Sequence, residues 1–569
     1  MFGLSLGKLG QVGGVPFSPA KLFSSGEQGA WYDPSDFSTL YTDSAGTTPV
    51  TAVEQSVGLM LDKSKGLLLG PEIVSNGDFS GGTTGWSLTG TAASQAVSGG
   101  VLTVTRGTSA TYSSATITTV VGKMYKLSVD VGAFTQSPVL RISTTLGGTE
   151  NYNVTYTSSG NKTAVFTATA TTTYVSLYAP GNSGDTTSWD NISVRELPGN
   201  HAYQTTSSSR PTLRARYNLL TYSEQFDNAA WTKRGAATAA NTTAVTAPDG
   251  TSTADIIQNL GVSGIDDLFQ HSSTVALDAA ISPSFYIYKI TSTGTLRLQS
   301  PVSNTRGVWL INLALLSSGW ERITATHPAV TISTAFTGSG AANNGLMFVA
   351  QSGGPLSFYI WGAQLVPTAV FPSNTYQRIA AATDYDTGSA FPPYLFFDGV
   401  DDSLLTNSVD FSAGDKMTVW AGVTKSSDAA AAVLAELSAE VNVNNGAFAC
   451  YVQTNGRYTW ISRGTASASA QSSTATTPVP STDVFVGIGD ISSDVATLRI
   501  DGAQAATSST DQGTGNFGTY PLYIGRRNNA TLPLNGNIYS LIIRGAESTA
   551  AQISSTESWV AAKTPLGSL

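Results

Sequence analysis

The chain has 569 residues, of which 41% are hydrophobic and only 12% are charged, and its formal net charge at pH 7 is −9. Ser, Thr, Gly and Ala take the place of the missing charges, a composition that suits β-sandwiches with polar loops. An acidic chain with no Lys/Arg run longer than two residues repels a phosphate backbone, which argues against nucleic acid as a partner. The length predicts three or four domains, each with its own core.

The N-terminal segment, residues 1–26, is rich in Gly with scattered Leu, Val and Phe. It lacks the basic start, the apolar run and the cleavage site of a signal peptide, and no stretch of 18 apolar residues occurs anywhere in the chain. We therefore expect no export signal and no membrane insertion. The segment is also too short and too rich in Gly to build a core of its own.

Alternation of apolar and polar residues with period two predicts β-strands along most of the chain. In 123–134 the apolar face consists of Tyr125, Leu127, Val129 and Val131. Similar strands are predicted at 165–179, 285–291, 356–365, 416–424, 483–491, 496–504 and 536–545. Asp501-Gly502 predicts a hairpin turn, and one helix is predicted over 548–564 with Ser548 as its cap. The fold class is therefore all-β, a set of β-sandwiches.

Two stretches, "GLMLDKSKG" (58–66) and "GNHAYQTTSSSRPTLR" (199–214), form one continuous phrase when they are joined. Segments 67–198 and 217–383 share an outline: an apolar strand, a Phe followed by a Trp, alternating strands and a closing aromatic strand. A sandwich whose first and last strands are neighbours inserts easily into a surface loop. We therefore predict two inserted sandwiches, 67–198 and 217–383. The interrupted domain comprises 27–66, 199–216 and 384–569.

Several phrases resemble known families. The spliced text, with "YLFFDGVDDSLLT" and "LYIGRRNNATLPLNGNIYSLIIRG", resembles the LamG/concanavalin A-like jelly rolls of bacteriophage virion proteins. The opening of phage tail-region proteins is similar to "GEQGAWYDPSDFSTLYTDSAGTTPV". A sandwich module of phage tail and fibre proteins is similar to "NLLTYSEQFDNAAW" with "YIWGAQL". "IVSNGDFSGGTTGW" with "WDNISV" is similar to carbohydrate-binding modules of the CenC-like class.

This resemblance implies a virion protein that assembles in the cytoplasm of the infected host cell and is released by lysis, so that it needs no signal peptide. It implies that residues 1–26 dock onto other virion proteins. It also implies a homo-oligomer, and fibres of this kind are commonly trimers, although no coiled-coil heptad or collagen repeat supports a trimer here.

Catalytic machinery is not visible in the sequence. Cleavage of a glycan usually needs two carboxylates, and the densest cluster, "DGVDD" (398–402), lies where turn chemistry alone favours Asp and Gly. The histidines His201, His271 and His327 are far apart and lack the spacing of metal ligands. The single cysteine, Cys450, lies in a strand-like phrase and is expected to be buried.

Sugar binding is the activity that the residues favour, because aromatic rings on a sheet face can stack on pyranose rings. The candidates are Trp86, Tyr152, Tyr156, Tyr178, Trp189, Tyr286 and Tyr288, with Trp231 and Trp361 as further aromatic residues of the second segment. Core packing is the alternative for the tryptophans, whereas Tyr152 and Tyr156 are expected to be exposed because "ENYNVTYTSSG" is polar.

The CenC-like resemblance also implies a structural calcium, for which Asp78 and Asp190 are the candidate ligands. Ser80 stands where the family often has an acidic residue, and this removes one hard oxygen ligand. The function expected from these observations is that of a non-enzymatic virion protein, a tail fibre, spike or decoration-like appendage, that attaches to glycans of the host surface. The alternatives are a polysaccharide depolymerase of a tail spike and a purely architectural virion protein without a ligand.

Overall fold

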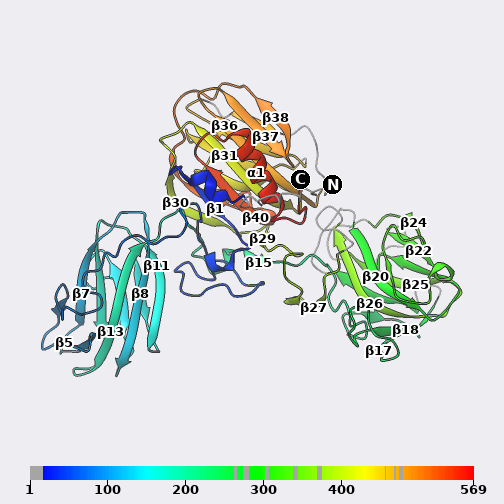
Figure 1. Ribbon diagram of the computed structural model, residues 1–569, viewed down its shortest axis with the longest axis horizontal. Coiled ribbons are helices and arrows are strands. Elements are labelled where there is room, and N and C mark those ends of the chain that lie inside the picture. The colour runs from blue at the N-terminus through cyan, green and yellow to red at the C-terminus, as the bar shows by residue number, and fades with distance from the viewer. Residues whose placement is uncertain are drawn as a thin grey trace, which may run out of the picture.

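The computed structural model describes residues 17–261, 266–272, 281–301, 307–336, 344–367, 375–454, 456–466, 469–472 and 479–569. Nearly all of the regular structure is antiparallel β-sheet, which confirms the all-β fold class. Figure 1 shows three bodies, a central domain with a β-sandwich on either side of it. Colour runs from blue to red within the central domain, so this domain contains segments from both ends of the chain.

Two large sheets face each other in the central domain. Sheet A contains β15 (Thr212–Arg214), β29 (Tyr394–Asp398), β40 (Asn535–Arg544), β31 (Lys416–Lys425), β36 (Ser481–Asp490), β37 (Val495–Ile500) and β38 (Ala503–Ser508), with β1 (Gly29–Tyr32) paired to β40. Sheet B contains β2 (Leu40–Tyr41), β3 (Leu59–Met60), β14 (Ala202–Tyr203), β30 (Leu404–Asp410), β39 (Thr519–Ile524), β32 (Ala432–Leu437), β33 (Ala447–Val452), β34 (Tyr458–Arg463) and β35 (Ser469–Ser472). The main core lies between these sheets and includes the buried Cys450.

Segments that are far apart in the sequence share these sheets. Strand β14 pairs with β3 on one side and with β30 on the other. Strand β15 pairs with β29, and β1 pairs with β40. The stretches before, between and after the two inserted sandwiches therefore fold into one body.

The first sandwich consists of two sheets. Sheet C contains β11 (Gly160–Thr167), β8 (Met124–Phe134), β13 (Thr186–Glu196), β6 (Val101–Thr105) and β5 (Ser94–Ser98). Sheet D contains β10 (Tyr152–Thr155), β9 (Val139–Ser143), β12 (Thr172–Ala179), β7 (Thr111–Thr118) and β4 (Ser87–Thr89). The strand predicted over 165–179 is two strands, because the chain crosses from sheet C to sheet D between β11 and β12.

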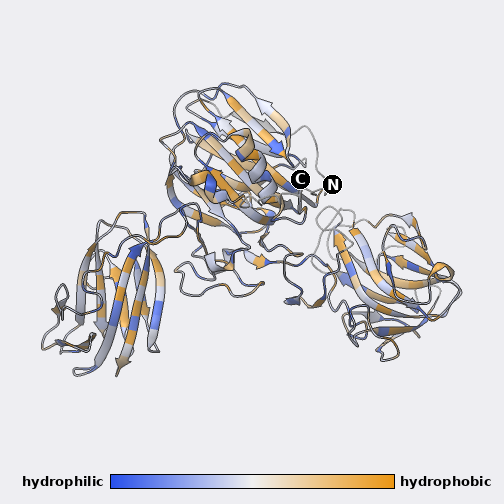
Figure 2. Ribbon diagram, viewed as in Figure 1, coloured by the Kyte–Doolittle hydropathy of each residue, from blue (hydrophilic) through white to orange (hydrophobic). Residues whose placement is uncertain are grey.

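Burial follows the period-two pattern in this sandwich. The predicted apolar face of β8 is buried and its intervening residues are partly exposed. Figure 2 shows the same alternation of hydrophobic and hydrophilic residues along the strands. Each sheet therefore presents one face to the core and the other to solvent.

The second sandwich has the same two-layer plan. Sheet E contains β16 (Thr232–Lys233), β19 (Leu268–Ser272), β25 (Asn344–Ser352), β21 (Thr295–Gln299), β22 (Val308–Asn312) and β24 (Val330–Thr334). Sheet F contains β17 (Thr238–Asn241), β18 (Asp255–Leu260), β26 (Leu356–Pro367), β20 (Ile281–Lys289) and β23 (Glu321–Ile323). A hairpin of β27 (Ile379–Ala381) and β28 (Asp384–Tyr385) follows, so the chain forms a paired element at the predicted boundary between 383 and 384.

Each sandwich begins close to where it ends. In the first, Gly70 N–H donates to Glu196 O at 2.9 Å and Glu72 forms a β-bridge with Arg195. In the second, Leu219 N–H donates to Leu365 O at 2.9 Å. Both sandwiches therefore leave the central domain and return to it through segments that are hydrogen-bonded to each other.

Helix α1 (Ala550–Ala561) covers part of the outer face of sheet A, as Figure 1 shows. Its N-cap is Thr549, not the predicted Ser548, because the Thr549 hydroxyl accepts from Gln552 N–H while Ser548 Oγ accepts from Arg544. Short 3-10 helices are η1 (Pro19–Phe23), η2 (Phe37–Thr39), η3 (Ser207–Ser209) and η4 (Leu313–Leu315). No helix of the described residues is long and apolar enough to cross a membrane.

The segment around η1 belongs to the central domain. Leu22 and Phe23 are buried with residues of β31, β40 and α1, and Arg544 Nε donates to Leu22 O at 2.8 Å. The predicted boundary between a docking segment 1–26 and a domain that begins at 27 is therefore wrong for residues 17–26, because their apolar side chains complete this small core. Residues 1–16 lie outside the described part of the chain.

Candidate functional site

Four predicted sugar-binding residues lie in the core of the first sandwich: Trp86, Tyr152, Tyr156 and Trp189. The expectation that Tyr152 and Tyr156 are exposed is wrong, because the alternation that runs along β10 and continues into the next residue, Tyr156, places both rings on the side that faces the core. Their hydroxyls lie 3.3 Å apart, and burial raises the pKa of both phenols. Trp231 of the second sandwich is also fully buried. A ring in these positions offers no face to a ligand.

Tyr178 lies on the outer face of sheet D, where it forms a cluster with Tyr112 and Arg141. The rings of Tyr178 and Tyr112 stack with their centroids 4.8 Å apart. The Arg141 guanidinium lies 4.5 Å from the centroid of Tyr178, and its Nη1 donates to the Tyr112 hydroxyl at 2.9 Å. Because the phenols are only half-buried, this cluster presents hydroxyls and a cation to solvent.

Backbone and side-chain acceptors hold Arg141 in place. Its Nε donates to Asn153 Oδ1 at 3.2 Å and its Nη1 donates also to Gly147 O at 3.0 Å. Beneath it, Ser114 Oγ donates to Ser176 Oγ at 3.0 Å. The cluster is therefore preorganised, with a polar floor that suits hydroxylated ligands.

Tyr286 and Tyr288 lie on the outer face of sheet F, the face away from the core of the second sandwich. Strand register pairs Tyr288 with Tyr359 and Tyr286 with Trp361 across β20 and β26. The ring centroids are 5.7 Å apart in the first pair and 5.5 Å in the second. Two neighbouring rows of aromatic side chains thus form one surface, which we call the aromatic face.

Further aromatic residues border the aromatic face. Trp320 packs against Tyr288 with centroids 6.0 Å apart, and its Nε1 donates to Thr246 O at 2.7 Å. Trp361 is almost buried, and its Nε1 donates to Thr253 Oγ1. Arg322 lies over the ring of Tyr286 at 5.1 Å. Tyr286, Tyr288, Tyr359 and Trp320 keep partly exposed rings, so this surface can stack on sugar rings.

Sequence reasoning missed Tyr112, Arg141, Tyr359 and Trp320. Period-two alternation in "LSFYIWGAQL" already places Tyr359 on the same face as Trp361, so a signal for it existed. Arg141 stands in the apolar phrase "VLRIS", which gives no sign of the tyrosines that it contacts, because those contacts arise from strand pairing.

The candidate calcium ligands, Asp78 and Asp190, each accept hydrogen bonds from residues close to them in the sequence. Asp78 Oδ1 accepts from Ser80 N–H and Ser80 Oγ in an exposed turn, which lowers the pKa of Asp78. Asp190 Oδ1 accepts from Asn191 N–H. In the described part of the chain neither aspartate belongs to a group of three acidic, His or Cys side chains at ligand distance. Calcium binding stays a prediction.

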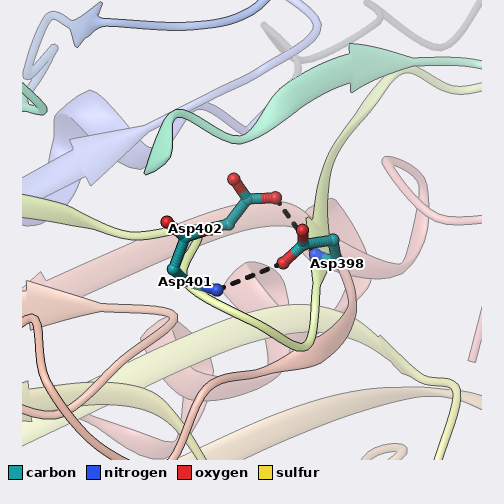
Figure 3. A group of neighbouring side chains, drawn as sticks. All are labelled: Asp398, Asp401 and Asp402. Atoms are coloured by element: carbon teal, nitrogen blue, oxygen red, sulfur yellow. Dashed lines mark hydrogen bonds between the residues drawn. The ribbon is translucent and has the colours of Figure 1, made fainter. Parts of the chain in front are cut away.

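The acidic turn, residues 398–402, does bring carboxylates together, as Figure 3 shows. Oxygens of Asp398, Asp401 and Asp402 lie within 4.8 Å of one another. Asp398 N–H donates to Asp402 Oδ2, and Asp398 Oδ1 accepts from Val400 N–H and Asp401 N–H. Burial and the neighbouring charges raise the pKa of Asp402 to about 7. The hydrogen bonds agree with a turn that its own side chains stabilise.

A second carboxylate pair lies at sheet B, where Arg527 contacts both members. Arg527 Nε lies 2.9 Å from Glu436 Oε2 and its Nη1 lies 2.7 Å from Glu440 Oε2. Glu436 Oε1 also accepts from Val441 N–H, and burial raises the pKa of Glu436. Because Glu436 is fully buried and bonded on both oxygens, this pair has the character of a structural ion pair.

The chain is similar to solved structures of a sialidase, of the CBM40 of another sialidase and of a pentraxin. The NanB sialidase of Streptococcus pneumoniae is 15% identical with a TM-score of 0.22, and the match covers 28% of this chain and 26% of the sialidase. The CBM40 of the Ruminococcus gnavus IT-sialidase, bound to α2,6-sialyllactose, is 16% identical with a TM-score of 0.22, over 26% of this chain and 92% of that one. The SAP-like pentraxin of Limulus polyphemus is 11% identical with a TM-score of 0.22, over 26% and 70%.

This chain thus spans about a quarter of the NanB sialidase that it matches. No curated protein matches it. A family model does match residues 398–554, which comprise most of the C-terminal part of the central domain. That stretch has the fold of the Concanavalin A-like lectin/glucanases superfamily.

Proposed function

We propose that this protein is a non-enzymatic virion appendage that binds glycans of a host-cell surface through its two sandwiches. The observation that carries the binding part is the aromatic face, where Tyr286, Tyr288 and Tyr359 share the outer side of one sheet. Partly exposed rings in rows can stack on successive sugar rings. The virion part rests on the resemblance of the sequence phrases to phage proteins.

Single sugar contacts are weak, so attachment at a cell surface depends on several contacts acting together. The chain carries two candidate surfaces on separate sandwiches, the aromatic face and the cluster around Tyr178. An oligomer, for which a trimer is the expected form, multiplies these surfaces further. Docking onto other virion proteins would hold all copies on one particle.

The experiment for the binding part is a glycan array followed by titration of the best glycan. Tyr288→Ala and Tyr359→Ala are each expected to weaken binding about tenfold, since each removes one stacking ring. Tyr520→Ala is the matched control, because Tyr520 is a half-buried tyrosine of the central domain, away from both candidate surfaces. Equal loss in all three variants would contradict a site on the aromatic face.

A polysaccharide depolymerase is the second candidate. Glycosidases use a pair of carboxyl groups, one of which has a raised pKa and acts as the acid, and Asp402, with its pKa raised to about 7, lies beside the carboxylate of Asp398. Incubation of the protein with host capsule or lipopolysaccharide distinguishes the two functions. We expect no new reducing ends and no unsaturated sugars. The appearance of either, abolished by Asp402→Asn, would establish the enzyme.

The virion assignment has a separate test. Mass spectrometry of purified phage particles is expected to find this chain, and a reconstruction would place it on the tail or the capsid. Normal adsorption by particles whose copies lack both sandwiches, together with an array negative for every glycan, would support a purely architectural protein.

A further inference from the structure

A pocket of about 430 Å³ lies where the second sandwich joins the central domain. One wall is the outer face of sheet A, and the other is the linker that follows β15 together with the end of β26. This volume is in the range of pockets that hold small ligands, roughly 300–1,000 Å³. None of the rings of the aromatic face lines it, whereas two carboxylates do, those of Glu54 and of Asp398 in the acidic turn.

Strand register explains the chemistry of the sheet wall. Phe396, Asn537 and Thr424 lie in one row across β29, β40 and β31. Their neighbours along the strands, Leu395 and Ile538, point into the main core, so this row faces outward. The wall therefore offers the half-buried Phe396 ring, over which the Arg214 guanidinium lies at 4.1 Å, beside the Asn537 amide, whereas the buried Thr424 hydroxyl bonds to Thr482 and Tyr539.

The linker wall contributes a cation. Arg216 lines the pocket and donates from Nε to Asn218 O at 3.2 Å and from Nη2 to Leu219 O at 3.4 Å. None of the described carboxylates forms an ion pair with Arg216, whereas its neighbour Arg214 pairs with Glu54 at 3.2 Å. Burial lowers the pKa of Arg216, but a guanidinium stays charged.

The nearby Glu54 charge favours the charged form of Arg216 but pairs directly with Arg214, so a ligand carboxylate would give this partly buried cation a direct partner of its own. A guanidinium is also well suited to carboxylate recognition because its planar N–H groups match two oxygens. We infer that this pocket binds an acidic sugar of the hexuronic-acid type, with its carboxylate at Arg216 and its ring and hydroxyls at Phe396 and Asn537. This site is independent of the proposed function of the aromatic face.

Titration calorimetry of the full chain with D-glucuronate tests the inference, with D-glucose as the neutral probe and acetate as the carboxylate without a ring. We expect saturable binding of glucuronate, at least tenfold weaker binding of glucose and acetate, and weakening by added salt. Equal affinity for glucuronate and glucose, or no binding of glucuronate, would overturn it.

Variants locate the site. Arg216→Gln is expected to weaken glucuronate binding about tenfold or more, and Arg216→Lys, which keeps the charge, to weaken it less. Asn537→Ala provides a second wall position, and thermal melting shows whether each variant is folded. Lys21→Ala, which removes an exposed cation that does not line the pocket, should leave glucuronate binding unchanged. Glucuronate binding that falls with Tyr288→Ala and survives Arg216→Gln would place the ligand on the aromatic face and refute the pocket.

Discussion

The imidazole Nδ1 of His201 accepts a hydrogen bond of 2.9 Å from the main-chain N–H of Asp62. Asp62 precedes the first sandwich and His201 follows it, so this bond closes the gap in the interrupted phrase. The Asp62 carboxylate in turn accepts from Trp31 N–H at 2.8 Å and from Asn200 N–H at 2.7 Å. One buried carboxylate, that of Asp62, thus connects β1 with the segment that leads into the first sandwich and with the segment that follows it.

This arrangement predicts a pH dependence of stability. His201 Nδ1 accepts, so Nε2 carries the proton and donates to Leu197 O at 3.1 Å, and burial lowers the pKa of His201 despite the nearby Asp62 charge. An unfolded histidine takes up a proton below about pH 6.5, which the folded one resists. Stability is therefore expected to fall as pH drops from about 6.5 towards the lowered pKa of the folded state.

His201→Gln removes this titration while its amide oxygen can still accept from Asp62 N–H. We expect the melting temperature of the variant to depend less on pH between 7 and 5 than that of the native chain. At pH 8 neither chain carries a charge at this position, so the difference in melting temperature there measures the loss of stability that the substitution itself causes. An unchanged slope between pH 7 and 5 would show that His201 is not the responsible group.

The acidic turn predicts the opposite trend. The pKa of Asp402 is raised to about 7, so the folded state holds a proton that the unfolded state releases above about pH 4, and stability falls as pH rises from about 4 to 7. Asp402→Asn keeps an acceptor for Asp398 N–H and removes the charge. Because solvent screens part of the repulsion, we expect the variant to gain about 1 kcal/mol at pH 8 and nothing near pH 4.

Differential scanning calorimetry at pH 4 and pH 8 measures this change. Asp410→Asn is the contrasting variant, since Asp410 Oδ1 accepts from Ser412 and Thr519 and these hydrogen bonds lower its pKa. That variant is expected to lose stability at pH 8. A gain of similar size from both substitutions would mean that the general negative charge of the chain, and not the acidic turn, is responsible.

The N-terminal segment yields a prediction about stability. Leu22 is fully buried against sheet A and α1, so Leu22→Ala is expected to cost the central domain about 2–4 kcal/mol. Deletion of residues 1–26 removes this side chain and the carbonyl that accepts from Arg544, and should lower the melting temperature at least as much. Substitution of the exposed neighbour Lys21 by Ala is the control. A deletion without any thermal effect would show that the segment contributes only docking.

The strands were predictable because period-two burial follows from sheet geometry alone, as β8 shows. The turn at Asp501-Gly502 was predictable for the same local reason, since both residues take positive φ there. The inward direction of Tyr152 and Tyr156 was misjudged because polar neighbours were taken as a sign of exposure. In an edge strand those neighbours occupy the outer side of the same alternation, and Tyr152, Val154 and Tyr156 share the inner side.

Pairing between distant strands was the part that local patterns could not supply. The contact of Arg141 with Tyr112 and Tyr178 depends on the order of β9, β12 and β7 in sheet D. The pocket depends on where the second sandwich lies against sheet A. A sequence reports which side of a strand a residue occupies, whereas the strand order decides its neighbours.

The paired ends of the first sandwich predict that it can be removed. Gly70 and Glu196 are hydrogen-bonded neighbours, so a two-residue Asn-Gly turn can replace residues 71–195. We expect the shortened chain to keep a cooperative melting transition for the central domain. A modest loss of stability is expected, because Leu59 and Leu61 lose their contacts with Met124 and Val165.

The matching experiment expresses residues 70–197 alone. This segment contains a complete core between sheets C and D, with Trp86 and Trp189 inside it, so it is expected to fold and melt cooperatively. Circular dichroism and calorimetry of the two pieces check both expectations. If the isolated sandwich folds but the shortened chain does not, the central domain requires the first sandwich for its own folding. The inserted segment would then be part of the central fold.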